Sequence, residues 1–318
     1  MGKPAEYFPF ELILDPRYFG LVSGFHDGPF GRLHYVRGVQ LQHGSEATVF
    51  LHGVANDWTT WTPLLQLACD QSPGKKPAEV LGDFILVDLP GFGRSDNKED
   101  HLEGRLVGDL VIELARTLGF DRVRLVGHSM GGFLALDIAA RHAKVVSSVH
   151  LVAGAYFSVI RTVQSPWLSL LSRHKVAVAY FSQSALAMLG PAGLLLIRAL
   201  ARTRLLPLSL RGFLAYPWSA NRSFLDGLTR GMRPKSFLLA AQNGIDYDPD
   251  VEWQKIHCPV VGVFGVKDKL VPVSDMVDLR RVCDSAEVHL LDSCAHFPQV
   301  EMPHRTYQLL LGGRGRDE

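Results

Sequence analysis

The sequence predicts an α/β protein in which a mostly parallel central sheet carries helices on both faces. Short apolar runs rich in β-branched residues recur along the chain, as expected of strands buried on both faces. Segments with apolar residues at helical spacing lie between those runs. This alternation favours parallel strands joined by right-handed crossovers, with the connecting helices packed on both faces of the sheet.

The first half of the chain contains most of the predicted elements. Residues 1–15 predict a tail with a few apolar anchors, and an opening hairpin follows, with strands at 19–22 and 33–36. Residues 71–77 are rich in Pro, Gly and Lys and predict a surface loop. Buried strands and helices alternate after the hairpin, with strands at 47–51, 84–87, 123–126 and 145–152 and helices at 58–69, 102–118 and 132–140.

The alternation stops at Gly154. From 155 to 244 the pattern shows no clear strand, and Leu- and Ala-rich helical stretches are broken by prolines. Strand and helix signals then resume at 260–264, 274–282, 288–291 and 301–311, before a frayed tail. We therefore expect a core made of residues 1–154 and 245–318, with a helical cap, or lid, inserted over 155–244.

Composition and charge exclude several classes of protein. Hydrophobic residues make up 47% and charged residues 20% of the chain, which is typical of a globular protein with a large core. The 33 basic and 32 acidic residues form no long basic run, so we expect no nucleic-acid partner. The most apolar stretch, 185–197, is interrupted by Gly190-Pro191 and is too short to span a bilayer, so we expect no stable membrane insertion. The oligomeric state stays open.

Further signals concern compartment and cofactors. The four cysteines show no Cys-x-x-Cys spacing, and the N-terminus lacks the apolar core of a signal peptide, which together favour reduced thiols and a cytoplasmic location. No run of residues has metal-ligand spacing, and Gly91-Phe92-Gly93 is a turn, not a dinucleotide fingerprint. We expect neither a metal nor an organic cofactor.

The motif Gly127-His128-Ser129-Met130-Gly131 joins a predicted strand to a predicted helix through a very short turn. Such a turn strains the backbone of its central residue, and the two glycines let helix and strand approach closely. The turn projects the Ser129 hydroxyl from the edge of the sheet. The N–H of Met130, at the positive end of the helix, then faces an oxyanion formed there. Ser129 is our candidate nucleophile.

A serine attacks a carbonyl only when a base takes its proton and a third group orients that base. In open α/β sheets these groups lie on loops beyond the carboxyl ends of the strands. Asp268 and His296 each follow one of the last two predicted strands, so they are the candidate acid and base. Asp275 and, more weakly, Asp292 are alternatives for the acid.

The loop after the first buried strand supplies a candidate for the second oxyanion donor. His52-Gly53 lets the backbone turn so that the N–H of Val54 points inward. The predicted cap is strongly apolar, which predicts a pocket for an acyl chain or a hydrophobic alcohol. We expect His52, Gly53, His128 and Trp218 to contact the substrate.

In this order and spacing, the motifs resemble those of the α/β-hydrolase superfamily, specifically its lidded, esterase- and lipase-like members with a serine nucleophile. The matching stretches are 51–53, 88–95, 127–132, 265–272 and 296–303. The resemblance spans residues 31–311 and implies the α/β-hydrolase fold, with Ser129, Asp268 and His296 as the catalytic triad and Val54 with Met130 as the oxyanion hole. Ala295 stands where many relatives have glycine, a change that removes no catalytic group.

The resemblance implies a carboxylic-ester hydrolase that acts on a small apolar ester through an acyl-enzyme. Serine at position 129 argues against haloalkane dehalogenases and epoxide hydrolases, which need aspartate there. One alternative is a C–C bond hydrolase of the meta-cleavage-product type, which shares the triad, although Asn56-Asp57-Trp58 lacks the proline that such relatives carry. The other is a non-catalytic, ligand-binding protein of the same fold.

Overall fold

The computed structural model describes residues 3–38, 45–98, 102–154, 156–172, 174–201, 203 and 205–312. Its centre is an eight-stranded sheet in the order β1-β2-β4-β3-β5-β6-β7-β8. The strands are β1 (Val22–Gly28), β2 (Gly31–Gly38), β3 (Glu46–Leu51), β4 (Phe84–Val87), β5 (Arg122–His128), β6 (Val146–Val152), β7 (Val260–Gly265) and β8 (Ala286–Leu291). The hairpin β1–β2 is antiparallel to its neighbours and the other strands pair in parallel, which confirms the predicted fold class.

The α-helices up to the end of β6 are α1 (Thr62–Gln71), α2 (Pro77–Leu81), α3 (Gly104–Thr117) and α4 (Met130–Arg141). Those between β6 and β7 are α5 (Phe157–Gln164), α6 (Pro166–Ser172), α7 (His174–Met188), α8 (Pro191–Ala201), α9 (Leu205–Ser209), α10 (Arg222–Gly231), α11 (Pro234–Gln242) and α12 (Pro249–Glu252). The last are α13 (Ser274–Val282), α14 (Pro298–Glu301) and α15 (Pro303–Leu310). Short 3-10 helices are η1 (Pro16–Phe19), η2 (Trp58–Trp61), η3 (Pro217–Ser219) and η4 (Trp253–Lys255).

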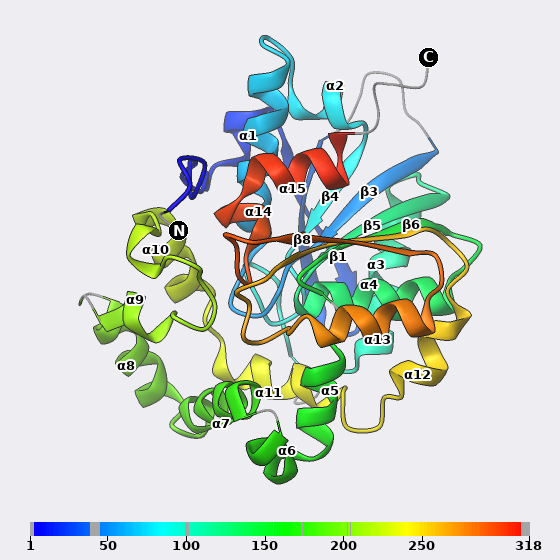
Figure 1. Ribbon diagram of the computed structural model, residues 1–318. Helices are drawn as coiled ribbons and strands as arrows, with labels where there is room; N and C mark the ends of the chain where they lie inside the picture. The colour runs from blue at the N-terminus through cyan, green and yellow to red at the C-terminus, as the bar shows by residue number, and fades with distance from the viewer. Residues whose placement is uncertain are drawn as a thin grey trace.

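The sheet is covered on both faces (Figure 1). Successive side chains of a strand point to opposite faces, so neighbours on β5 join different cores. Leu125 packs in the cluster with α3, α4 and α13, whereas Val126 packs in the cluster with α1 and α15. This double burial explains why apolar residues predominate on both faces of the central strands.

Two local predictions differ from the structure. The first strand was predicted at 19–22, but Phe19 ends the 3-10 turn η1 and β1 begins only at Val22. Pro77, the last residue of the predicted loop at 71–77, is instead the first residue of the short helix α2, which the Glu79 side chain caps. The N-terminal tail, in contrast, is as expected: its described part forms no helix or strand before Pro16, and Tyr7 and Phe8 anchor it in a core cluster with Phe224 and Phe297.

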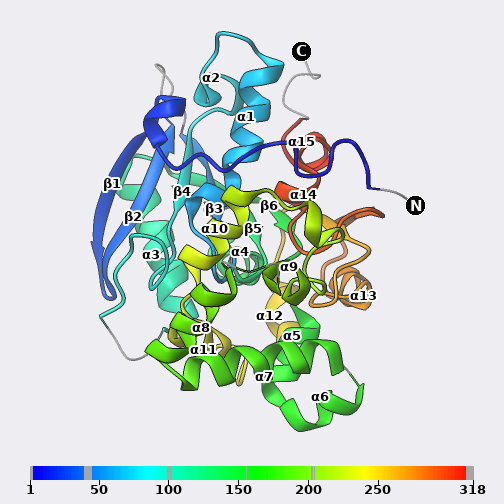
Figure 2. The same cartoon turned by 90° about the vertical axis from the view of Figure 1, so that its left-hand side faces the viewer.

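Helices α5, α6, α7 and α11 lie at the opposite end of the molecule from α1, α2 and α15 (Figure 1 and Figure 2). Every regular element that the structure describes between β6 and β7 is helical. Residue 155, where the sequence placed the boundary of the cap, and 313–318 of the predicted frayed tail lie outside the described residues. Within the described ranges, each helix is too short or too polar to traverse a bilayer.

Candidate active site

Ser129 lies between β5 and α4 with a strained backbone, at φ 55° and ψ −122°. A Cβ on Gly127 would lie 2.3 Å from the carbonyl oxygen of Gly131, and a Cβ on Gly131 would lie 2.1 Å from the carbonyl oxygen of Leu51. Both approaches are too close for any side chain. The turn therefore requires glycine at both positions, and its geometry holds the Ser129 side chain at the start of the helix.

Ser129, His296 and Asp268 form one chain of hydrogen bonds, although they follow three different strands. The Ser129 Oγ lies 2.9 Å from Nε2 of His296, and Nδ1 of His296 lies 2.7 Å from Oδ2 of Asp268. The main-chain N–H groups of Leu270 and Val271 donate to Oδ1 of Asp268, at 2.8 and 3.1 Å, and hold the carboxylate in place. All three side chains are buried.

The rival acid Asp275 is engaged elsewhere. Its carboxylate accepts the main-chain N–H of Ser158 at 2.9 Å and the hydroxyl of the same residue. Burial raises the pKa of Asp275 to about 7. The carboxylate that meets His296 is thus that of Asp268, in the loop that follows β7.

Two buried groups hold the main chain around His296. The Nε2–H of His128 donates to the His296 carbonyl at 2.8 Å, and burial together with the nearby His296 ring lowers the pKa of His128 well below its usual value. His128 is therefore a neutral structural donor. Its buried ring contacts His296 and Phe297, and it does not line the pocket described below.

Glu301 is the second group, and its role was not predicted from the sequence. Its fully buried carboxylate accepts hydrogen bonds from the main-chain N–H groups of Ala295 and Phe297, the two neighbours of His296, at 3.1 and 2.9 Å. It also accepts the Tyr7 hydroxyl at 2.7 Å and the N–H of Ala215 at 2.8 Å. Burial raises the pKa of Glu301. The sequence did contain a signal for this role, namely a glutamate five residues after the candidate base and flanked by apolar residues.

His52 orients the peptide that leads into Val54. Its ring is fully buried, and burial lowers its pKa, so the ring is neutral. One nitrogen lies 2.7 Å from the Gly53 carbonyl oxygen and the other accepts the N–H of Leu89 at 3.0 Å. Because a trans peptide points its C=O and N–H in opposite directions, the bond to Gly53 directs the N–H of Val54 away from His52. A Cβ on Gly53 would lie 2.7 Å from Cβ of Ser129, so this backbone passes directly beside the serine.

Tyr156, just after β6, was not predicted to belong to the site. Its hydroxyl lies 2.5 Å from the Ser129 Oγ and accepts the main-chain N–H of Met130. Burial raises the pKa of Tyr156, so the phenol keeps its proton. A consistent set of donors follows, in which Met130 donates to Tyr156, Tyr156 to Ser129, and Ser129 to His296.

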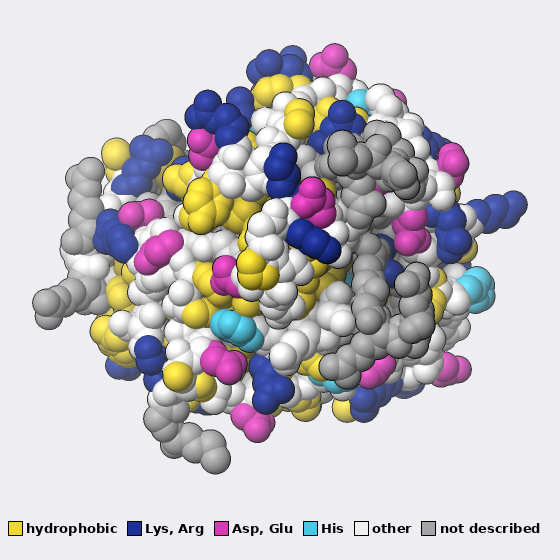
Figure 3. All heavy atoms as spheres, turned by 90° about the horizontal axis from the view of Figure 1, so that it is seen from above, with side chains coloured by type: hydrophobic (Ala, Val, Ile, Leu, Met, Phe, Trp, Pro, Cys, Tyr) yellow, Lys and Arg dark blue, Asp and Glu magenta, His cyan; other side chains and the backbone are white. Residues whose placement is uncertain are grey.

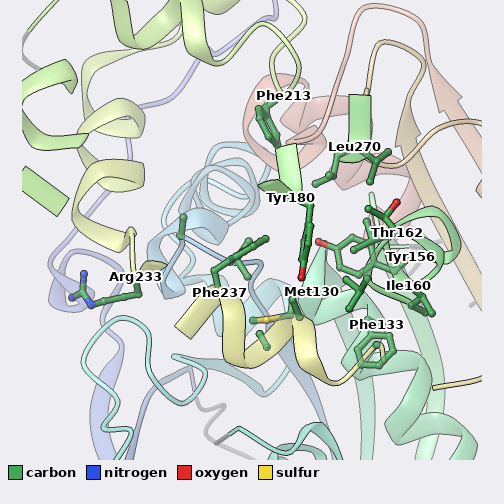
Figure 4. A pocket seen from close by; sticks show the side chains of 18 of the residues that line it. Met130, Phe133, Tyr156, Ile160, Thr162, Tyr180, Phe213, Arg233, Phe237 and Leu270 are labelled. Carbon is green, nitrogen blue, oxygen red and sulfur yellow. The ribbon is translucent and has the colours of Figure 1, made fainter. Parts of the chain in front are cut away.

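A mostly apolar pocket opens beside these groups (Figure 4). Its walls come from the core and from α5, α7 and α11, and include Val54, Met130, Tyr156, Tyr180 and Phe237. Arg233 is the cation in the lining. Trp218 is 59% exposed, stacks under the guanidinium of Arg211, and is not among the lining residues. The pocket thus gives no support to the predicted contact of Trp218 with substrate.

Comparisons with known proteins show what the chain is similar to. A family model described as "Alpha/beta hydrolase family" matches residues 48–309. The chain is 28% identical over 279 residues to "Probable lysophospholipase BODYGUARD 1" of Arabidopsis thaliana, a match that covers 80% of this chain and 55% of that protein. It is 26% identical over 302 residues to a 2-hydroxy-6-oxononadienedioate/2-hydroxy-6-oxononatrienedioate hydrolase of Burkholderia vietnamiensis, covering 91% of this chain and 93% of that protein.

The fold is also that of solved structures. A thermophilic esterase from Thermogutta terrifontis superposes with a TM-score of 0.62 at 16% identity, covering 91% of this chain and 95% of the esterase. The chain spans only about half the length of the Arabidopsis relative.

Proposed function

Because the chain belongs to the alpha/beta hydrolase family, we propose that it is a serine hydrolase that cleaves carboxylic esters of apolar substrates through an acyl-enzyme intermediate. One observation carries the proposal: the continuous hydrogen-bond chain from Ser129 through His296 to Asp268. That arrangement suits a hydroxyl nucleophile, a base and a group that orients the base.

In the proposed reaction, the Ser129 Oγ attacks the ester carbonyl carbon while Nε2 of His296 takes the hydroxyl proton. Asp268 keeps the proton on Nδ1 of His296 and stabilises the imidazolium that forms. His296 then returns its proton to the leaving alcohol as the ester C–O bond breaks. A water molecule, deprotonated by the same nitrogen, attacks the acyl-enzyme and releases the acid and free Ser129.

The charge on the tetrahedral intermediate needs donors, for which we propose the N–H groups of Met130 and Val54. The Tyr156 hydroxyl supports this choice of donors. It accepts the N–H of Met130 and lies 2.5 Å from the Ser129 Oγ, which is where the oxyanion would form. We therefore assign Tyr156 as the occupant of the oxyanion site in the free protein. A substrate carbonyl must displace this hydroxyl in order to react.

The pocket walls suggest the substrate class. Apart from Arg233, whose guanidinium donates to the main-chain carbonyls of Arg230 and Met232, the side chains that line the pocket are apolar or uncharged. Helices α5, α7 and α11 supply much of the lining, and in our proposal the helical segment 155–244 is a cap that encloses the acyl group. The acid, the alcohol or both would be apolar.

The test is hydrolysis of p-nitrophenyl esters from acetate to palmitate by the wild type and by Ser129→Ala. Ser209→Ala, which removes an exposed hydroxyl from α9, is the matched control. We expect ester turnover in the wild type and the control, a loss of at least a thousandfold in Ser129→Ala, and labelling of Ser129 by a fluorophosphonate. Equal turnover in Ser129→Ala would refute the assignment, and a wild type inactive on every ester would refute the ester class.

A second candidate is C–C bond hydrolysis, favoured by the Burkholderia relative that matches nearly end to end. It would use the same three side chains on a 2-hydroxy-6-oxo-dienoate. Comparing kcat/KM for such a compound with that for the best p-nitrophenyl ester separates the two candidates. A protein that binds both compounds but turns over neither would be a non-catalytic binding protein.

A further inference from the structure

Helices α6 and α7 expose apolar side chains where surface helices normally expose charge. Trp167, Leu168 and Leu171 on α6 are 75%, 71% and 88% exposed. On α7, Val178 and Met188 are exposed as well. The solvent-facing side of a helix is normally polar, so exposed apolar faces of this kind indicate an interaction surface.

Helix α8 repeats the pattern in its clearest form. Ala192, Leu195, Leu196 and Ala199 are all exposed and follow the spacing i, i+3, i+4 and i+7. This spacing is that of the stripe a helix usually buries, here turned to the outside. Helices α6, α7 and α8 contact one another in sequence, so the three stripes belong to neighbouring helices.

The charges of the same region have one sign. Residues 156–225 contain eight Lys and Arg and neither Asp nor Glu, which leaves 25 basic and 32 acidic residues in the rest of the chain. Two of the eight cations pair with carboxylates from outside this segment: Arg222 with Asp226 on α10 at 2.8 Å, and Arg161 on α5 with Asp278 on α13 at 2.7 Å. By contrast, the face above α1 and α15 shows basic and acidic side chains interspersed (Figure 3).

From this combination we propose that α6, α7 and α8 form a docking surface for a bilayer that contains anionic lipids. Amphipathic helices lie in a membrane interface when one face is apolar and their charges are cationic. Anionic headgroups attract Lys and Arg, while the exposed Leu and Trp side chains enter the acyl boundary. A second copy of the chain is a poorer occupant, because it would bring the same cations together with no carboxylates between them.

The position of α7 connects this surface to the pocket. Val176 and Tyr180 line the pocket from the inner side of α7, whereas Val178 is exposed on the outer side. A docked protein would therefore hold one wall of its pocket against the lipid. This consequence for substrate supply rests on the proposed ester hydrolysis, but the docking itself does not.

The experiment is sedimentation with vesicles, using Ser129→Ala protein so that hydrolysis cannot alter the lipid. Vesicles of phosphatidylcholine alone are compared with vesicles containing about one-third phosphatidylglycerol. We expect at least a tenfold stronger association with the anionic vesicles, weakened by high salt. No association with either vesicle would refute the docking surface, whatever the outcome of the ester assays.

Substitutions locate the contact. Leu195→Ser with Leu196→Ser should weaken association at least tenfold. The matched control, Val251→Ser with Val277→Ser, changes two exposed apolar residues on α12 and α13 and should leave association unchanged. Equal effects in the two double variants, with folding checked by circular dichroism, would overturn the location.

A charge variant tests the electrostatic part. Arg198→Gln on α8 should weaken association about fivefold, whereas Arg116→Gln, exposed on α3, should not change it. Equal weakening by both would mean that the protein senses the membrane only through its total charge, which contradicts a defined surface.

A spectroscopic readout needs no change in α6, α7 or α8. Trp58, Trp61 and Trp253 are buried, so replacing Trp218 by Phe leaves Trp167 as the single exposed tryptophan. Lipids with brominated acyl chains should quench its fluorescence in anionic vesicles. Unquenched Trp167 in sedimenting protein would refute the proposal. Concentration-dependent dimers in light scattering, abolished by the α8 substitutions, would instead assign the surface to a second copy.

Discussion

Replacing Tyr156 by phenylalanine removes a single oxygen atom from the candidate oxyanion site and keeps the ring. In the free protein this oxygen lies 2.5 Å from the Ser129 Oγ and accepts the N–H of Met130. An ester carbonyl oxygen bound by the same N–H cannot share that position. The variant therefore tests whether the hydroxyl hinders substrate binding or assists the reaction.

The expected size of the effect follows from the two hydrogen bonds. When the carbonyl oxygen enters, the N–H of Met130 exchanges one acceptor for another, so that bond is conserved. The bond between Tyr156 and Ser129 is lost, and a buried neutral hydrogen bond contributes about 0.5–1.5 kcal/mol. The phenylalanine variant has no such bond to break, so we expect kcat/KM to rise about two- to tenfold.

The assay is initial-rate hydrolysis of p-nitrophenyl butyrate below KM, together with the rate of Ser129 phosphonylation by a fluorophosphonate. The second measurement reports attack at phosphorus and is independent of deacylation. Tyr18→Phe, which removes an exposed phenol from η1, is the control and should leave both rates unchanged.

The opposite sign would refute the reasoning. If the Tyr156 hydroxyl moved only slightly and donated to the oxyanion, its removal would lower kcat/KM by about a hundred- to a thousandfold. That result would make Tyr156 an oxyanion donor. A change of less than twofold in both rates would mean that the hydroxyl leaves the site at negligible free-energy cost.

Three further predictions concern the framework of the site. The pKa of Asp275 is raised to about 7, so the folded protein binds a proton at this carboxyl more tightly than the unfolded chain does. Protonation of Asp275 therefore stabilises the folded state fully below about pH 4, and this stabilisation is lost as the pH rises to about 7. Asp275→Asn should remove up to about 4 kcal/mol of that pH dependence in urea unfolding, and unchanged dependence would contradict the assignment. Glu301→Gln should lower stability by about 1–3 kcal/mol and lower kcat more than it changes KM, because the loop of His296 loses an acceptor; unchanged kcat would limit Glu301 to folding. Gly131→Ala should prevent folding, since the added carbon lies 2.1 Å from a main-chain oxygen of β3, whereas Gly212→Ala, with no atom within 3.8 Å, should fold normally when compared by circular dichroism.

The sequence predicted the central sheet because buried parallel strands leave a strong local signal. The strand β4 is a continuous apolar run and buried apolar residues predominate in β3, β5 and β7, as expected of strands whose two faces are covered by helices. The periphery was predicted less well. Residues 16–19 form a 3-10 turn and residues 77–81 a helix, because short elements at an edge depend on caps and neighbouring packing more than on pattern.

The candidate site divides in the same way. Ser129, Asp268 and His296 could be selected because each lies in the turn or loop that follows a predicted strand, and the structure brings these three together. Tyr156 and Glu301 were not predicted. Their partners include residues 27 and 86 positions away in the chain, and no local pattern marks such pairs.

By itself, the sequence determined the fold class, the order of the core elements and the three residues that meet at the end of the sheet, because short-range periodicity and chain order carry that information. Only the tertiary structure decided that Asp275 pairs with Ser158, that Trp218 lies outside the pocket and that a tyrosine hydroxyl lies within hydrogen-bond distance of the Ser129 hydroxyl. A buried polar group must find a partner, and which of many eligible partners it finds depends on distances that exist only once the chain has packed.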